Sequence, residues 1–196
     1  MESGNHIPND NKIRCPWCLS FDDYIQYHDE EWGVPVHDDN KHFEFLILEG
    51  AQAGLSWATV LKKRNGYKDA FANFDPQVVS QFPVEKIEEL MLNSGIIRNR
   101  LKITSVINNA RLFLQIQKEF GSFDKYIWGF VNHETVKNSL QSMSDAKATS
   151  KESDALSKDL IKRGFKFTGS TVMYAYMQAC GLVNDHLVNC NRYDQV

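Results

Sequence analysis

Apolar residues recur at helical spacing along most of the 196-residue chain, and this periodicity restricts its fold more than any other feature. Between 84 and 93, for example, Val84, Ile87, Leu90 and Met91 fall on one face of a helix. The segments with this patterning are 41–53, 57–71, 84–93, 98–120, 123–131, 154–163 and 170–180. Neither a convincing alternating strand pattern nor an internal repeat occurs, so we predict an all-α fold with a polar loop at 139–153.

Capping residues and glycines set the expected helix ends. Gly54 ends the apolar segment 41–53, and Ser56 is a good N-cap for 57–71, where Gly66 is a candidate for an early break. Near the C-terminus His186 and Cys190 lie four residues apart. This spacing places both side chains on one face of a single helical turn.

Length and composition fit one domain with short ends: a flexible extension at 1–13, a single domain at 14–190 and a tail at 191–196. The net charge of −3 gives no overall nucleic-acid signal, which is usually a basic surplus. No apolar run approaches the roughly 18–20 residues of a membrane-spanning helix, and the first residues lack a secretory signal. We therefore expect a cytoplasmic protein with no membrane partner.

Four cysteines and two histidines offer candidate metal ligands: Cys15, Cys18, His28, Cys180, His186 and Cys190. Thiolate and imidazole are the preferred ligands of zinc, and a structural site takes four of them. A Cys and a His from each end of the chain could clip the two ends together. Two alternatives stay open: small buried cysteines with no ligand, and a redox pair formed by Cys15 and Cys18, although no βαβ pattern accompanies that pair.

Glu49 follows an apolar run and precedes three small residues, so its carboxylate is expected to point into the protein. A buried carboxylate needs compensation, either from a salt bridge or helix N–H donors, or from a polar or cationic ligand in a cavity. Gly50, Ala51, Ala53 and Gly54 would leave room for that cavity, with the aromatic face of Trp57 as one wall.

Residues 94–103, SGIIRNRLKI, lie between two predicted helices. A glycine-containing hairpin there would expose backbone N–H groups at the start of the second helix, with Arg98, Arg100 and Lys102 alongside as an anion site. This arrangement suggests contact with a DNA backbone. The basic clusters at 62–64 and 162–166 are instead typical of ordinary solvated helix faces or ends.

Several separated motifs together resemble bacterial 3-methyladenine DNA glycosylase I, over about residues 14–190. The residues that carry the resemblance are Cys15–Trp17, Tyr24, Tyr27–Pro35, Leu48–Trp57, Gly95–Arg98, Lys162–Phe167 and Met177–His186. The resemblance implies a helix-hairpin-helix glycosylase fold, a helical bundle whose N- and C-terminal segments are joined by a zinc site. It also implies a monomeric base-excision repair enzyme that hydrolyses the N-glycosidic bond of N3-methyladenine in alkylated double-stranded DNA. The free base would leave without a lyase step.

The resemblance also implies site residues. One structural Zn²⁺ would be held by Cys15, His28, His186 and Cys190, and the DNA hairpin would be Gly95, Ile96, Ile97 and Arg98. The flipped base would meet Glu49, Tyr27 and Trp57, with Trp17, Tyr24 and Trp32 completing an aromatic pocket. Cys18 lies outside the family pattern. An alternative ligand set is therefore a Cys3His arrangement in which Cys18 replaces Cys15 or His28. A zinc-stapled module that binds nucleic acid without catalysis is the alternative function.

Overall fold

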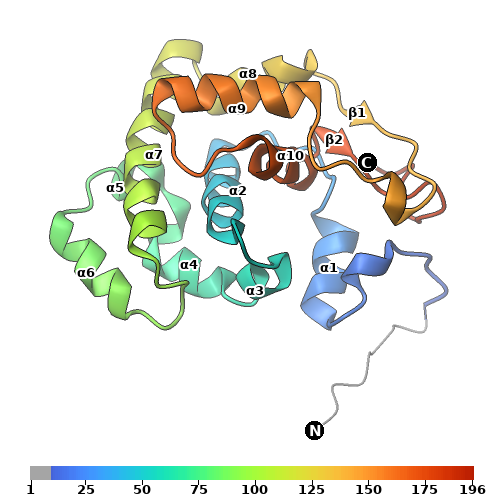
Figure 1. Ribbon diagram of the computed structural model, residues 1–196, viewed down its shortest axis with the longest axis horizontal. Helices are drawn as coiled ribbons and strands as arrows, with labels where there is room; N and C mark the ends of the chain where they lie inside the picture. The colour runs from blue at the N-terminus through green and yellow to red at the C-terminus, as the bar shows by residue number, and fades with distance from the viewer. Residues whose placement is uncertain (1–9) are drawn as a thin grey trace, which may run out of the picture.

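A computed structural model describes residues 10–196, so residues 1–9 of the predicted N-terminal extension lie outside the described residues. Helices account for most of the described chain (Figure 1). The α-helices are α1 (Asp22–Glu30), α2 (Asp39–Gln52), α3 (Trp57–Leu61), α4 (Arg64–Ala70), α5 (Pro76–Val79), α6 (Val84–Leu92), α7 (Arg100–Phe120), α8 (Phe123–Trp128), α9 (Lys151–Arg163) and α10 (Ser170–Ala179). Short 3₁₀ turns are η1 (Pro16–Cys18), η2 (Ala72–Phe74), η3 (Gly129–Val131) and η4 (Met143–Asp145). No helix in this part of the chain is both long enough and apolar enough to cross a membrane.

Helix α2 lies at the centre of the molecule and packs against α3, α4, α7, α8 and α10 (Figure 1). The carboxylate of Asp38 caps its first turn by accepting the backbone N–H of Lys41 at 2.8 Å. Because α2 is surrounded, its apolar residues do not form a single stripe, and Phe43 and the run from Phe45 to Glu49 are buried on several sides. The buried position of α2 therefore fixes the surroundings of Glu49.

A column of phenylalanines joins three helices in the core. The ring of Phe43 in α2 lies 5.1 Å from that of Phe113 in α7, which stacks at 4.0 Å on Phe123 in α8. Aromatic pairs of this kind contribute about 0.5–1.5 kcal/mol each beyond the area they bury. The column anchors the long helix α7, whose first turn follows the predicted DNA hairpin.

The segment between α6 and α7 forms the predicted hairpin. Within it, Asn93 Oδ1 accepts the backbone N–H of Gly95 at 2.7 Å, and Asn99 caps α7. Helix α4 supports the hairpin closely, because a Cβ added at Gly66 would overlap the carbonyl group of Gly95. The Ile97 N–H also donates to the hydroxyl of Tyr67 in α4 at 3.3 Å.

Two local predictions are wrong. Helix 57–71 breaks at Lys62 and Lys63, not at Gly66, which lies inside α4 where its missing side chain admits the hairpin. Residues 185–190 contain no helical turn, so His186 and Cys190 do not lie on one face of a helix. The N–H of His186 instead donates to Asn184 Oδ1 at 3.1 Å.

The all-α prediction is confirmed in the sense that the fold is mostly helical, but a short parallel pair of strands accompanies the helices. Strand β1 (Val136–Lys137) pairs with β2 (Val183–Asn184), in the register Val136 to Val183. Strands of two residues are too short to show alternation in the sequence.

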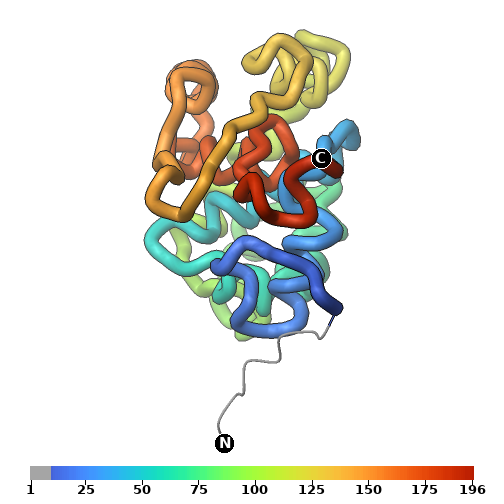
Figure 2. The backbone as a smooth tube through the Cα atoms, turned by 90° about the vertical axis from the view of Figure 1, so that its right-hand side faces the viewer, coloured from blue at the N-terminus to red at the C-terminus, as the bar shows by residue number. Residues whose placement is uncertain are grey.

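The first described residues lie beside the last ones, on one side of the molecule (Figure 2). The N–H of Asn191 donates to the carbonyl of Ile13 at 2.8 Å. Asn184 donates to the carbonyls of both Tyr193 and Val196 at 3.0 Å, which holds the last residues against β2. This arrangement brings cysteines and histidines from both ends together.

Candidate functional site

Cys15, His28, His186 and Cys190 form a fully buried cluster whose candidate ligand atoms all lie within 4.8 Å of one another. Cys190 Sγ lies 3.4 Å from His28 Nε2 and 3.6 Å from His186 Nδ1, and Cys15 Sγ lies 3.7 Å from His186 Nδ1. Zinc–sulfur and zinc–nitrogen bonds of about 2.3 and 2.0 Å in a tetrahedron give S···N edges of about 3.6 Å. The four residues can therefore hold a tetrahedral metal ion.

Partners outside the cluster orient its two histidines. His28 Nδ1 lies 2.8 Å from Asp29, whose carboxylate also pairs with the buried guanidinium of Arg14. His186 Nε2 lies 3.0 Å from the carbonyl of Trp32, which leaves Nδ1 to face the cluster. The Cys15 thiol and the two imidazoles hold the pKa of Cys190 well below its usual range. Such outer partners set ring orientation and thiolate character at metal sites.

Cys18 is not one of the four residues whose candidate ligand atoms lie close together, although its thiol interacts with His28. Its Sγ donates to the carbonyl of Cys15 at 3.2 Å within the η1 turn, and Cys180 is buried at the end of α10. The structure therefore brings together the four residues that the resemblance implies as ligands, and Cys18 is not part of this group. Cys15 belongs to this cluster, and Cys18 keeps a backbone partner of its own.

Rings of the N-terminal segment extend from the cluster toward α3. Trp17 lies 4.8 Å from Trp32, 5.0 Å from Tyr24 and 6.4 Å from Tyr27. Tyr27 in turn lies 5.2 Å from Trp57, the first residue of α3. Trp32 packs on the ring of His186 at 4.6 Å, so it contacts the cysteine–histidine cluster directly.

Glu49 is 3% exposed, and its Oε2 has no hydrogen-bond partner among the described residues. Burial raises the pKa of its carboxyl to about 8. Trp57 Nε1 is likewise buried without a partner in the described chain. Burial, together with the charge of Glu49, raises the pKa of Tyr27 well above its ordinary value and that of Tyr24 to about 12. A buried acceptor and a buried donor thus both lack partners among the described residues, a costly condition that a ligand can relieve.

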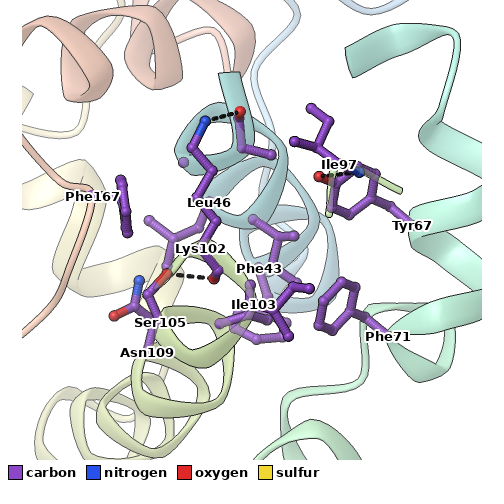
Figure 3. A pocket seen from close by; sticks show the side chains of 14 residues that line it. Phe43, Leu46, Tyr67, Phe71, Ile97, Lys102, Ile103, Ser105, Asn109 and Phe167 are labelled. Carbon is purple, nitrogen blue, oxygen red and sulfur yellow. Dashed lines mark hydrogen bonds between the residues drawn. The ribbon is translucent and has the colours of Figure 1, made fainter. Parts of the chain in front are cut away.

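A cavity of about 340 Å³ opens beside Glu49. It is lined by Glu49, Gln52, Ala53, Gly54, Leu55, Thr171, Val172 and Ala175. Ala53 and Gly54 leave room there, as the sequence suggests, whereas Gly50 and Ala51 line a different, nearly filled pocket beside Lys102 (Figure 3). Tyr27 and Trp57, whose rings contact each other, are not among the residues that line this cavity.

The hairpin presents one exposed cation. Arg98 is exposed, and it has no ion-pair partner among residues 10–196. Arg100 forms a two-bond pair with Glu88 at 2.6 Å, and the Lys102 ammonium turns inward to the end of α2. Of the three cations expected around an anion site, only Arg98 remains directed to solvent without a partner. Ile96 is buried and anchors the hairpin.

The sequence analysis did not identify some residues that lie beside the cysteine–histidine cluster or line the cavity. Asp29 directly follows the ligand His28, and an acidic residue beside a histidine ligand is a usable signal for an outer partner. Thr171, Val172 and Ala175 line the cavity from α10, far away in sequence. No local pattern marks those three.

A hairpin between two helices, a cavity with a buried carboxyl, and a metal-binding clip are together the features of a helical DNA glycosylase. Comparison with known proteins narrows this class. Residues 17–193 match the methyladenine glycosylase family, and the chain belongs to that family.

Individual relatives agree with this assignment. The DNA-3-methyladenine glycosylase 1 of Escherichia coli is 50% identical over 180 residues, which cover 92% of this chain and 96% of that protein. The DNA-3-methyladenine glycosylase of Haemophilus influenzae is 47% identical over 177 residues, 90% and 96% of the two chains. A crystal structure of a 3-methyladenine DNA glycosylase I variant in complex with 3-methyladenine superposes with a TM-score of 0.89 at 35% identity, covering 92% of this chain and 97% of that one.

Proposed function

We propose that this chain is a DNA-3-methyladenine glycosylase of base-excision repair, which hydrolyses the N-glycosidic bond of N3-methyladenine in alkylated double-stranded DNA. The observation that carries the proposal is the buried Glu49 carboxyl, without a hydrogen-bond partner among the described residues, at the wall of a cavity. The names of the relatives, and the base bound in one of them, support the same substrate.

The base must leave the helical stack before the enzyme can reach the bond, at a cost of a few kcal/mol. In this proposal the exposed Arg98 and the backbone of Gly95, Ile96 and Ile97 hold the DNA backbone. Meanwhile the flipped nucleotide enters between Trp57 and Glu49. Stacking on an aromatic ring contributes about 1–3 kcal/mol per base, and the methylated base, which is cationic in DNA, gains further from the ring face.

Glu49 selects the cation in this scheme. With a pKa of about 8, its carboxyl is largely protonated at neutral pH while the cavity is empty. A bound cationic base favours the carboxylate, which then accepts hydrogen bonds from the adenine edge, while Tyr27 adds a polar contact. Trp17, Tyr24 and Trp32 hold Tyr27 and the metal ligands in place. Unmodified adenine lacks the positive charge and loses this contribution.

Hydrolysis of the glycosidic bond needs little acid catalysis, because a cationic base is already a good leaving group without protonation. Water attacks the sugar as the bond breaks, with the DNA phosphates stabilising its positive charge. We propose no lyase step: the residues that line the cavity, all within the described chain, include no lysine that could form a Schiff base with the sugar. The enzyme thus leaves an abasic site and the free base.

One structural zinc ion fits the cluster of Cys15, His28, His186 and Cys190, since two thiolates and two imidazoles are a preferred donor set. When bound, the ion supplies folding energy by clipping the two chain ends, and the chemistry stays with the pocket residues. We propose that the enzyme is cytoplasmic, because a reducing compartment keeps the four cysteines as thiols. We also propose that it acts as a monomer.

The proposed function is tested by incubating the purified chain with duplex DNA treated with a methylating agent. We expect chromatography to detect free 3-methyladenine, and borohydride to trap no covalent complex with DNA. Binding to methylated DNA without release of the base would instead identify a non-catalytic binding module.

A further inference from the structure

The Lys102 side chain runs inward from the start of α7 along α2 (Figure 3). Its ammonium donates to the backbone carbonyls of Ala51 and Ala53, at 2.7 Å each. The side chain is half-buried, and burial lowers the pKa of the ammonium. The Lys102 ammonium is therefore partly removed from water and hydrogen-bonds two carbonyl groups at the end of another helix.

The position of Lys102 in α7 does not explain this side chain. Asn99 caps α7, so Lys102 occupies the third helical position, where the partial positive charge of the helix N-terminus disfavours a cation. The end of α2 has the opposite requirement. Its last carbonyls lack intrahelical partners and carry partial negative charge, and Ala51 and Ala53 belong to this end. The ammonium is favourable at α2 and unfavourable at α7.

The two ends that Lys102 joins carry different parts of the proposed site. The end of α2 continues directly into Gln52, Ala53, Gly54 and Leu55, which line the cavity beside Glu49, and then into Trp57. The start of α7 follows the hairpin, and Lys102 is four residues beyond Arg98. One side chain thus connects the DNA hairpin with the wall of the base cavity.

We propose that Lys102 is a positioning residue that fixes the cavity wall 52–55 relative to the DNA hairpin, an inference that rests on the proposed glycosylase function. Two of the three ammonium donors are committed to α2 at 2.7 Å, so the group acts through the carbonyls of Ala51 and Ala53. Recognition of the base then depends on Lys102 although Lys102 does not contact the base.

The test compares three variants of the full chain. Lys102→Met keeps the length of the side chain and removes the ammonium, and Lys102→Arg restores a donor that can reach both carbonyls. Arg100→Met is the matched control, since it removes a cation from the same turn whose partner is the exposed Glu88. For each variant we would measure the Kd of free 3-methyladenine, the salt dependence of duplex binding, base release and the melting temperature.

We expect Lys102→Met to weaken binding of free 3-methyladenine by about tenfold or more, because misplacing a site by about 1 Å has large effects. Its salt slope for duplex binding should stay at the wild-type value, and Lys102→Arg should recover most of the affinity for the base. Arg100→Met should leave the Kd of the free base unchanged.

Two outcomes would overturn the inference while wild-type protein releases the base. The first is a salt slope reduced by about one in Lys102→Met with unchanged base affinity, which would make Lys102 a phosphate contact. The second is a lower melting temperature alone, which would leave only a role in stability. If Lys102→Met does not fold, Lys102→Arg carries the test, and a folded Lys102→Arg that binds free 3-methyladenine about tenfold more weakly than wild type would overturn the inference. Failure of the wild-type protein to release the base would instead contradict the proposed function.

Discussion

The ring of Tyr27 lies 5.2 Å from that of Trp57, and Tyr27 immediately precedes the metal-cluster residue His28. One turn of α1 therefore faces the cluster with one residue and the proposed base site with its neighbour. This contact connects the cysteine–histidine cluster, through neighbouring residues of α1, with the indole of Trp57. We therefore expect that loss of a metal bound by the cluster would affect the proposed base site through the position of Tyr27.

Removing the charge of Glu49 is expected to reduce base excision. Glu49→Gln keeps the size and polarity of the side chain but cannot become a carboxylate beside a cationic base. We expect single-turnover release of 3-methyladenine to fall by on the order of a hundredfold, as is common when one electrostatic contact is lost. A rate equal to wild type would remove Glu49 from the site.

The same substitution should change how stability depends on pH. Glu49 has a pKa of about 8 in the folded chain against 4.5 for the ordinary group. Between these values the unfolded chain loses the proton and the folded chain keeps it, so wild-type stability falls as pH rises. Glu49→Gln should therefore gain more than about 2 kcal/mol relative to wild type between pH 4.5 and pH 8. Urea unfolding of both proteins measures this difference. If the free energy of unfolding of Glu49→Gln relative to wild type is the same at pH 4.5 and pH 8, the buried, uncompensated carboxyl is contradicted.

The flat face of the Trp57 indole is expected to contribute to base binding by stacking. Trp57→Leu removes the stacking surface, so we expect the Kd of free 3-methyladenine to rise by about 5- to 150-fold, given roughly 1–3 kcal/mol per stacked base. Trp57→Phe keeps a ring and should lose less. Calorimetric titration of both variants measures the difference, and equal affinities would argue against stacking.

Metal analysis tests the buried cluster. We expect about one zinc per purified chain. Cys190→Ser should lose the metal and lower the melting temperature, because the ion joins the two ends of the fold. Cys18→Ser is the matched control: Cys18 is not one of the four residues of the cluster, and metal content should stay at the wild-type value. Metal loss in Cys18→Ser would restore the Cys3His ligand set.

Gly66 offers a test of the hairpin support. Alanine normally stabilises a helix interior by about 1 kcal/mol over glycine. Here the added Cβ would overlap the Gly95 carbonyl, so we expect Gly66→Ala to lower stability and to weaken duplex binding. Gly129→Ala, where nothing lies within 4 Å of the added Cβ, should be tolerated. Equal stability of the two variants would show that the hairpin does not depend on this close contact.

The sequence predicted most helices because their periodicity and caps are local properties. It also located Glu49 as a buried carboxylate, since the apolar run before it is visible in the chain. The inward turn of Lys102 was not predictable, because it depends on where α2 ends relative to α7 in space. The α10 residues that line the cavity were missed for the same reason. The metal ligands were identified from spacing only as a set of alternatives, and the fold brought four of them together.

The central claim is that the cavity beside Glu49 receives a methylated adenine. A crystal structure of this chain with 3-methyladenine tests it most directly. The account predicts the base against the Trp57 indole, with its polar edge within hydrogen-bond distance of the Glu49 carboxyl, which lacks a partner among the described residues. A base bound elsewhere in the molecule, with the Glu49 cavity unchanged, would contradict it.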